Sequence, residues 1–525
     1  MASRALALAL VLTLPGCGTM FTPRVTATPA ITPVPIPEVT EAAVLPEVPS
    51  AELTDDYEAA FAQWYSQTVN WAPCERGFEC ATITAPLSWR DPAAGSIDLA
   101  LTRHRATGAR IGSLLTNPGG PGQPGVDFLQ AAYNQFGAPV RSAFDLIGFD
   151  PRGVGASTPI VCMDDAGKDA FISDDFPDTD AGREAMAQAN AEWGAACYQN
   201  TGELLGNVDT MSAARDMDLI RHLVGDAKLN YLGFSYGTQL GATYAGLFPQ
   251  RVGRMVLDGA IDLSLTPDEL SLGQAVGFET ALRNFVTACQ THGFGADGAC
   301  PLTGSVDEGL QQIGNLLAQV ETSPLPTESD RTVNRTLAFY GIALPLYDQG
   351  NWPILSMALE EAMNRGTGDV LLNLADFYND REGDGTFNSN STEAFQAIGC
   401  VDSRGTENPA EMARLADEVI AAAPTVGNFF TYGGLVCRDW PVPIAPGSFD
   451  LHAAGAPPIL VIGTTNDPAT PFAWAQGLAS TLDSGVLLTY DGEGHTAYTR
   501  SNACIADTVD EFLVSDIVPS NGKRC

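Results

Sequence analysis

The sequence has little positive charge. Lys and Arg together number 27 against 63 Asp and Glu, which gives a formal net charge of −36. Such a chain would be repelled by a nucleic acid or by an anionic membrane surface, so neither is a predicted partner. The acidic excess is compatible with cationic substrates, although the solubility of an exported acidic protein explains it more simply.

Histidine is also scarce, and the spacing typical of metal ligands is missing. The five histidines are His104, His222, His292, His452 and His495, so a mechanism with a histidine base must choose among them. Metal binding is not indicated, because the sequence has no CxxC pair and no Cys/His cluster. We therefore expect neither a metal nor a cofactor.

Long hydrophobic runs are missing beyond the first residues. The chain begins with a charge at Arg4, continues with an apolar run over 5–14, and reaches Leu-Pro-Gly-Cys at 14–17. This pattern predicts an export signal over 1–16, too short to span a membrane. The Leu-x-Gly-Cys ending resembles the bacterial lipobox, which implies lipid attachment at Cys17. The alternative is an ordinary signal peptide with an incidental cysteine.

The segment after Cys17 predicts a tether rather than a folded unit. Residues 17–52 are rich in Pro and Thr and cannot bury a core. We expect a protein that is lipid-anchored at the outer face of a bacterial cell membrane, or secreted. Ten further cysteines, an even number in an exported chain, predict disulfides. Spacing does not determine their connectivity; pairing of sequence neighbours would give 74–80, 162–197, 289–300, 400–437 and 504–525.

The order of apolar strands and helices predicts an α/β fold. Short apolar strands alternate with helical segments up to Asp262, as in a mostly parallel sheet covered by helices on both faces. The alternation then gives way to helical patterns, and apolar strands resume at 458–464 and 485–490. We predict a first part of the sheet domain over 53–264, an inserted helical cap over 265–394 and the rest of the sheet domain over 395–525.

One turn in this pattern carries the sequence of a nucleophile elbow. Gly233-x-Ser235-x-Gly237 joins an apolar strand to a helix of small residues. A strand that reverses directly into a helix leaves no room for side chains at the two glycines. Ser235 is thereby placed at a helix start, where free amides favour negative charge. The alternative is that this Gly-x-Ser-x-Gly pattern, which fixes only three positions, occurs by chance.

A serine nucleophile needs a base and an orienting acid, and later strand ends supply both. Ser235, Asp467 and His495 follow one another in the chain order of the α/β-hydrolase triad. Loops at the carboxyl ends of parallel strands meet along one edge of the sheet, so these residues can converge. His495 is the predicted base, because none of the other histidines follows a late strand.

The acid and the oxyanion donors are less sharply defined by the sequence. Asp467 is preferred over Asp491 and Glu493, which lie too close to His495 in the chain. It is also preferred over Asp258, whose strand precedes the insertion. The oxyanion of a tetrahedral intermediate needs two N–H donors. They are predicted to be the amides of Tyr236 and Gly120, with Gly119 as the other candidate and a plain Gly/Pro turn over 117–122 as the alternative.

Together these motifs resemble a known family. NPGGPG, FDPRGVGAS, NYLGFSYGTQLGATYAGLFPQRVGRMVLDGAID, NWPILSMALEEAM, ILVIGTTNDPATPFAWA and GEGHTAY are similar to the exported tripeptidyl-aminopeptidase-like branch of the prolyl-aminopeptidase family of α/β-hydrolases. The resemblance covers most of residues 60–525. Prolyl iminopeptidases proper carry His-Gly-Gly-Pro-Gly, whereas Pro118 takes the His position here. This departure favours the tripeptidyl branch over a single-residue prolyl aminopeptidase.

The resemblance implies a serine exopeptidase that removes short peptides, such as tripeptides, from free N-termini. Such an enzyme must bind an ammonium group, and Glu360 and Glu361 are candidates by their place in the cap, unless they are solvated helix-face residues. Two competing hypotheses are a carboxylesterase or lipase with the same triad and a lipid-anchored binding protein on an inactive scaffold. The intact Ser, Asp and His count against the second. The expected partners are peptides, with membrane contact only through Cys17.

Overall fold

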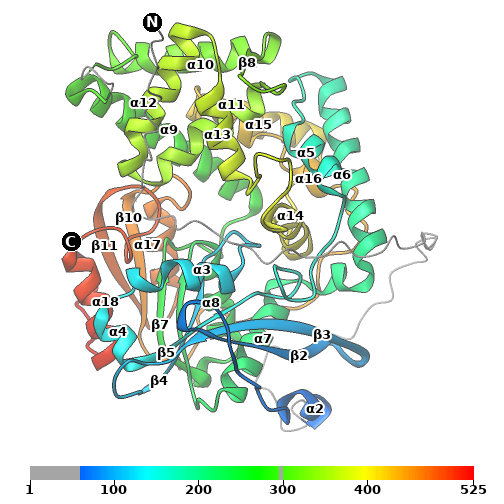
Figure 1. The fold of residues 1–525 in the computed structure, drawn as a ribbon, viewed down its shortest axis with the longest axis vertical. Helices are drawn as coiled ribbons and strands as arrows, with labels where there is room; N and C mark the ends of the chain where they lie inside the picture. The colour runs from blue at the N-terminus through cyan, green and yellow to red at the C-terminus, as the bar shows by residue number, and fades with distance from the viewer. Residues whose placement is uncertain (1–58, 295–298) are drawn as a thin grey trace, which may run out of the picture.

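The computed structural model describes residues 59–294 and 299–525, and its centre is a ten-stranded sheet (Figure 1). The strand order is β1-β2-β3-β5-β4-β6-β7-β10-β11-β12. The first three strands pair antiparallel with their neighbours, and all strands from β5 to β12 in this order run parallel. The strands are β1 (Ala72–Pro73), β2 (Glu79–Ser88), β3 (Asp91–His104), β4 (Gly112–Asn117), β5 (Phe144–Phe149), β6 (Leu229–Phe234), β7 (Val252–Asp258), β10 (Ile459–Asn466), β11 (Gly485–Glu493) and β12 (Lys523–Arg524).

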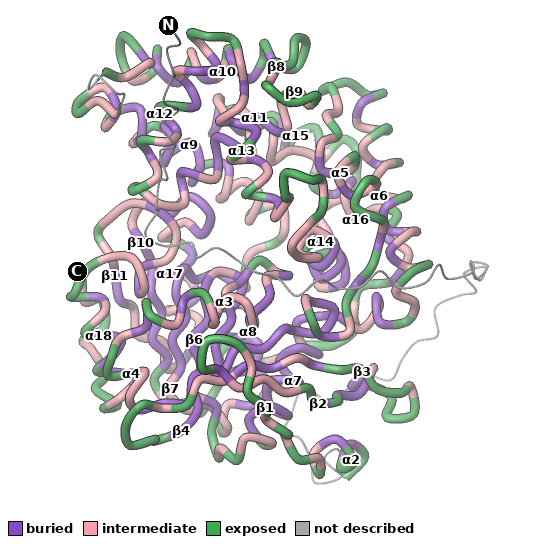
Figure 2. The backbone as a smooth tube through the Cα atoms, viewed as in Figure 1, coloured by how far each residue is buried: buried purple, intermediate pink, exposed green. Residues whose placement is uncertain are grey.

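The central strands are buried on both faces, which explains their uninterrupted apolar sequences (Figure 2). Neighbouring residues of β5 enter different cores: Leu146 packs with α3, α4 and α18, and Ile147 packs on the side of α7, α8 and α17. The predicted parallel sheet with helices on both faces is confirmed. These helices are α3 (Gly125–Ala132), α4 (Ala138–Ala143), α7 (Thr210–Leu223), α8 (Tyr236–Leu247), α17 (Phe472–Thr481) and α18 (Ala503–Ser515), and a short α2 (Ala62–Tyr65) lies near the start of the described chain.

A helical layer lies beyond the sheet, at the top of Figure 1. It begins after β7, as expected, and has a hydrophobic core of its own that includes Phe285, Leu317 and Leu355. Its elements are α9 (Pro267–His292), α10 (Val306–Thr322), α11 (Arg335–Ala343), α12 (Trp352–Glu360), α13 (Asp369–Tyr378) and the small hairpin of β8 (Leu325–Pro326) and β9 (Thr332–Val333).

Helices continue past residue 394, where the sequence pattern placed the end of the cap. α14 (Ser391–Asp402), α15 (Pro409–Ala422) and α16 (Gly434–Cys437) all precede β10. α14 buries Ile398 and Val401 in the core beside the sheet, whereas α15 returns to the helical core through Val419. A further helical excursion, α5 (Asp165–Ser173) and α6 (Asp180–Thr201), follows β5 and lies beside α14 and α16 (Figure 1).

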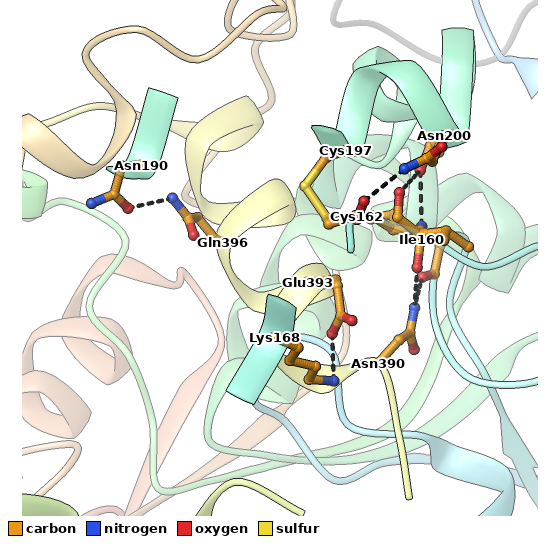
Figure 3. The surroundings of a disulfide bond; sticks show 12 residues. Ile160, Cys162, Lys168, Asn190, Cys197, Asn200, Asn390, Glu393 and Gln396 are labelled. Carbon is orange, nitrogen blue, oxygen red and sulfur yellow. Dashed lines mark hydrogen bonds and ion pairs between the residues drawn. A yellow bond between two sulfur atoms is a disulfide. The ribbon is translucent and has the colours of Figure 1, made fainter. Parts of the chain in front are cut away.

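Five disulfides join the same sequence neighbours that the cysteine spacing suggested. The pairs are Cys74–Cys80, Cys162–Cys197, Cys289–Cys300, Cys400–Cys437 and Cys504–Cys525. The 162–197 pair ties the chain after β5 to α6 (Figure 3). The predicted signal peptide, Cys17 and the tether lie outside the described residues. Among the residues that the structure describes, no helix has both the length and the apolar character needed to cross a membrane.

A buried ion pair anchors the loop after β5. Arg152 and Asp216 are both inaccessible, and two guanidinium nitrogens of Arg152 donate to the Asp216 carboxylate at 2.7 Å each. The same guanidinium donates to the carbonyls of Leu87 and Asn207, and Trp89 Nε1 donates to Asp216 at 2.8 Å. Every charge is therefore compensated, which is the condition under which an ion pair can be buried.

We expect Arg152→Met to lower the free energy of unfolding by about 3–5 kcal/mol, because the substitution leaves the Asp216 carboxylate buried without a cation. Urea unfolding of the purified protein measures this change. Arg414→Met is the matched control: Arg414 also bridges two carboxylates, Glu411 and Glu418, but on an exposed helix face, and should leave the midpoint unchanged. Equal effects of the two substitutions would contradict the assigned role of the buried pair.

Candidate active site

Ser235 occupies a strained turn between β6 and α8. Its backbone has φ 55° and ψ −123°, a conformation that residues with a side chain rarely adopt. A Cβ atom at Gly233 would come within 2.3 Å of the Gly237 carbonyl oxygen, and one at Gly237 within 2.9 Å of the Asn117 carbonyl oxygen. Both glycines are therefore required by the close approach of strand and helix, as the sequence pattern predicted.

His495 follows β11 and is held by Asp467, which follows β10. His495 Nδ1 lies 2.9 Å from Asp467 Oδ1 and 3.0 Å from Oδ2, and the Asp467 side chain is inaccessible. Asp467 also accepts the amides of Ala469, Thr470 and Thr496. Because these bonds fix the carboxylate, they orient the imidazole with its other nitrogen available for proton transfer.

Thr470 is a contact that sequence reasoning did not identify. Its hydroxyl lies 3.0 Å from Asp467 Oδ2 and 3.2 Å from His495 Nδ1. The hydroxyl therefore lies beside the bond between acid and base. The sequence offers one signal for it, the Asn-Asp-Pro-Ala-Thr turn after β10, in which amides and a hydroxyl fold back on the aspartate.

The acids that compete with Asp467 have other partners. Asp491 forms an ion pair with Arg524, and Glu493 accepts hydrogen bonds from Asn284 and Asn466. Burial raises the pKa of Glu493, and its two asparagine partners oppose this shift. Among the carboxylates that the structure describes, Asp467 is the one that hydrogen-bonds the His495 ring.

Asp258 connects the serine turn to the histidine loop. Its carbonyl oxygen accepts the Ser235 amide at 2.9 Å, and its Oδ2 accepts the amides of Ala497 and Tyr498 at 3.0 and 2.8 Å. A Cβ at the next residue, Gly259, would lie 3.2 Å from His495 Cε1. The end of β7 therefore contacts both the serine turn and the histidine loop. Burial raises the pKa of Asp258 to about 6, against the two amide bonds.

Two amides next to Ser235 have no acceptor among the described residues. One belongs to Tyr236, the first residue of α8, and the other to Gly120 in the loop after β4. The amide of Gly119, the other candidate, instead donates to Asn117 Oδ1 at 3.0 Å. A Cβ at Gly119 would lie 2.9 Å from Ser235 Cβ and 3.2 Å from the Tyr236 nitrogen, so the loop lies directly against the serine turn. This geometry favours Gly120 over Gly119 as the second oxyanion donor.

The helical layer reaches the histidine directly. The Tyr347 carbonyl, in the short η5 turn (Leu344–Tyr347), accepts the His495 amide at 2.8 Å. The Tyr347 ring meets the imidazole edge-on, with centroids 5.5 Å apart. The inserted helices are therefore placed over the histidine side of the site.

The two glutamates suggested as ammonium ligands have structural partners instead. Glu361 accepts the Thr367 hydroxyl and the amides of Asp369 and Val370, so it satisfies the free N–H groups at the start of α13. Glu360 forms an ion pair with Arg365 on the surface. The expectation that either binds the substrate amine is not supported, because both carboxylates are bonded to groups of the helical layer itself.

The other four histidines lie in different surroundings. His104 stacks on Tyr133 at 3.9 Å, and His222 meets Tyr65 edge-on. His452 bonds the Thr481 carbonyl, and His292 ends α9. In the described parts of the chain, no group of His, Cys, Asp and Glu is arranged to hold a metal ion.

A hydroxyl on a strained strand-to-helix turn, joined through Asp258 to the loop of a histidine whose Nδ1 is held by a buried carboxylate, is the arrangement needed for acyl transfer through serine. The fold and this geometry define a serine hydrolase of the α/β-hydrolase class. The chain belongs to the TAP-like family within that class: the family description "TAP-like protein" matches residues 423–525, and relatives align over most of the chain.

Three relatives show how far the similarity extends. A protein named Serine protease Hip1 from Mycobacterium tuberculosis is 35% identical over 490 residues, 87% of this chain and 91% of the relative. Carboxylesterase B from Mycobacterium tuberculosis is 36% identical over 463 residues, 86% of each chain. Tripeptidyl aminopeptidase from Streptomyces lividans is 30% identical over 480 residues, 87% of this chain and 86% of the relative. The family resemblance inferred from the motifs is confirmed.

We expect Ser235→Ala to lower kcat by roughly 10³- to 10⁶-fold, the range measured for members of such triads. Folding should be retained, because the substitution removes one oxygen atom at a turn. Hydrolysis of a chromogenic substrate and thermal unfolding, measured on the same preparation, test the two parts. Residual activity within tenfold of wild type, in a preparation free of other hydrolases, would rule out Ser235 as the nucleophile.

Proposed function

We propose that this protein is a serine exopeptidase that releases short peptides, chiefly tripeptides, from substrates with a free N-terminus. Ser235 is the nucleophile, His495 the general base and acid, and Asp467 the carboxylate that orients the imidazole. The amides of Tyr236 and Gly120 bind the oxyanion. The single observation that carries this assignment is the His495–Asp467 hydrogen bond of 2.9 Å beside the Ser235 turn.

The residues suggest a two-step acyl transfer. Ser235 Oγ attacks the scissile carbonyl while His495 Nε2 takes its proton, and the carbonyl oxygen becomes an oxyanion between the two amides. Collapse of this intermediate breaks the C–N bond, and His495 returns the proton to the leaving amine. Water then attacks the acyl-enzyme with His495 again acting as base, which releases the short peptide and restores the Ser235 hydroxyl.

The helical layer supports an exopeptidase rather than an endopeptidase. It contacts the His495 loop through the Tyr347 carbonyl, so it covers that side of the site, as a cap that limits substrate length would. A substrate that ends within the layer would place its α-ammonium there. Because desolvating an ammonium is costly unless it is paired, the site must supply carboxylates or carbonyls for it. The relative named Tripeptidyl aminopeptidase, 30% identical, supports the same substrate class.

The second candidate is a carboxylesterase. The same catalytic residues cleave esters, and the 36% identical relative named Carboxylesterase B favours this alternative. The two hypotheses differ in what they require of the substrate. A peptidase of this kind depends on the free amine, whereas an esterase depends on an activated acyl group.

We expect N-acetylation of a tripeptidyl chromogenic substrate to lower kcat/KM by roughly 30- to several-thousand-fold. Acetylation removes the positive charge and leaves its partner groups unpaired, a cost on the order of 2–5 kcal/mol. The free and acetylated substrates are compared on wild type, with Ser235→Ala as the background. Equal turnover of both, or faster cleavage of short acyl esters than of either, would favour the esterase.

We further propose that the protein is exported and lipid-anchored through Cys17, with residues 17–52 as a tether. The charged and apolar start followed by Leu-Pro-Gly-Cys supports this proposal. The five disulfides are compatible with an oxidising compartment.

We expect Cys17→Ala to move the enzyme from the detergent phase to the aqueous phase in a lipoprotein-processing bacterial host. The physical reason is the loss of the acyl chains, which contribute about 0.8 kcal/mol per buried CH₂ to membrane binding. Activity per folded molecule should not change, because the substitution lies far in sequence from the catalytic domain. Identical partitioning of wild type and variant would contradict the anchor.

A further inference from the structure

Besides its backbone amide, Tyr236 has a side chain that forms hydrogen-bond contacts of its own. Its side chain is buried, and its hydroxyl lies 2.7 Å from Thr210 Oγ1 at the start of α7. Thr210 in turn contacts Asp402, the last residue of α14, through its hydroxyl at 2.5 Å and its amide at 2.8 Å. A continuous chain of hydrogen bonds therefore runs from the residue after the nucleophile to a carboxylate outside the triad.

The direction of this chain follows from the donors available. The Thr210 hydroxyl has a single proton, and the Asp402 carboxylate in its ionised form can only accept, so in that form Thr210 donates to Asp402. Its oxygen is then left to accept the proton of the Tyr236 hydroxyl. Asp402 has no cation partner among the described residues, and burial raises its pKa to about 7 against the two Thr210 bonds. The Asp402 carboxylate is therefore buried at a cost in desolvation free energy, and its hydrogen bonds go to one residue, Thr210.

The opposite end of α14 lies against the oxyanion loop. A Cβ at Gly122 would meet the Ser391 carbonyl oxygen at 2.8 Å and the Ala394 side chain at 2.9 Å. Asn390, just before α14, donates to the carbonyls of Gly153 and Ile160 at 2.8 and 3.0 Å (Figure 3). One helix therefore contacts the loop of Gly120 at its start and the Tyr236 chain at its end.

Side-chain bonds hold α14 in this position. Lys168 of α5 and Glu393 form a buried ion pair of 2.7 Å, and Gln396 donates to Asn190 of α6 at 2.7 Å (Figure 3). The Cys400–Cys437 disulfide joins the same helix to α16 near its end. Since α14 is constrained along its whole length, Asp402 is a fixed point for the Thr210 hydroxyl.

We propose that Asp402 is a positioning residue for the oxyanion hole, acting through Thr210 and the hydroxyl of Tyr236. The chain holds the Tyr236 side chain and thereby the direction in which its amide points. The inference rests on the proposed serine hydrolase chemistry, but holds equally for peptide and ester substrates. It predicts an effect on the transition state, where the oxyanion forms, and none on substrate binding.

The test compares Thr210→Val, which keeps the shape and removes the hydroxyl, with Thr210→Ser, which keeps the hydroxyl. We expect Thr210→Val and Tyr236→Phe each to lower kcat about 3- to 10-fold with KM within twofold, the effect of one hydrogen bond. Thr210→Ser should restore wild-type kcat. Labelling of Ser235 by a fluorophosphonate probe, whose phosphoryl oxygen uses the same donors, should slow in parallel and is independent of the substrate preference.

Tyr244→Phe is the matched control. Tyr244 is buried on the same helix, and its hydroxyl donates to the Asp218 carboxylate of α7 at 3.2 Å, but it lies two turns further from Ser235. Its removal should leave kcat and the labelling rate unchanged. A merely structural role for both tyrosines would instead give equal losses that follow the change in thermal stability.

A double-mutant cycle tests whether Asp402 acts through this chain. We expect Asp402→Asn to lower kcat, and the combination with Tyr236→Phe to be no slower than the slower single variant. Additive losses, or unchanged kcat and labelling in Thr210→Val and Tyr236→Phe, would overturn the proposal. If wild type labels with the probe but cleaves no tripeptidyl substrate, the exopeptidase proposal fails while this test still decides the role of Asp402.

Discussion

The hydrogen bond from the Ser235 amide to the Asp258 carbonyl is the contact around which the site is arranged. Ser235 is held in a backbone conformation that costs free energy, on the order of 1–3 kcal/mol, and such strain persists only where the surroundings impose it. Asp258 supplies that constraint from the neighbouring strand. Its carboxylate also accepts two amides of the loop that carries His495, so one residue fixes the positions of nucleophile and base.

Different helices around the sheet contact different parts of the site. The layer between β7 and α14 reaches His495 through the Tyr347 carbonyl, and so covers the base. α14 contacts the loop that carries Gly120 and, through Asp402 and Thr210, the side chain of Tyr236. The base and the oxyanion donors are thus supported by different segments of helix.

Parts of this arrangement could be predicted from residues close together in the chain. The Gly233-x-Ser235-x-Gly237 turn and the strands that end before Asp467 and His495 depend on local sequence. The even number of cysteines predicted disulfides, but which cysteines pair was left open by the sequence. The extent of the helical part was not predictable in this way. α14 lies at the predicted end of the cap, and only its packing places Ile398 beside the sheet.

The sequence by itself determined the chemistry. It indicated which serine can occupy a strained turn, which histidine follows a late strand, and which aspartate lies between them in chain order. Periodicity and glycine spacing encode these features because they reflect the geometry of single elements. Only the tertiary structure decided what the other buried carboxylates do. Glu361 caps a helix, Asp258 joins the serine turn to the histidine loop, and Asp402 bonds Thr210, which in turn contacts Tyr236. The partners of Asp258 and Asp402 lie far away in the sequence. A charged or polar side chain pairs with the groups nearest to it in space, and a local sequence pattern does not contain that information.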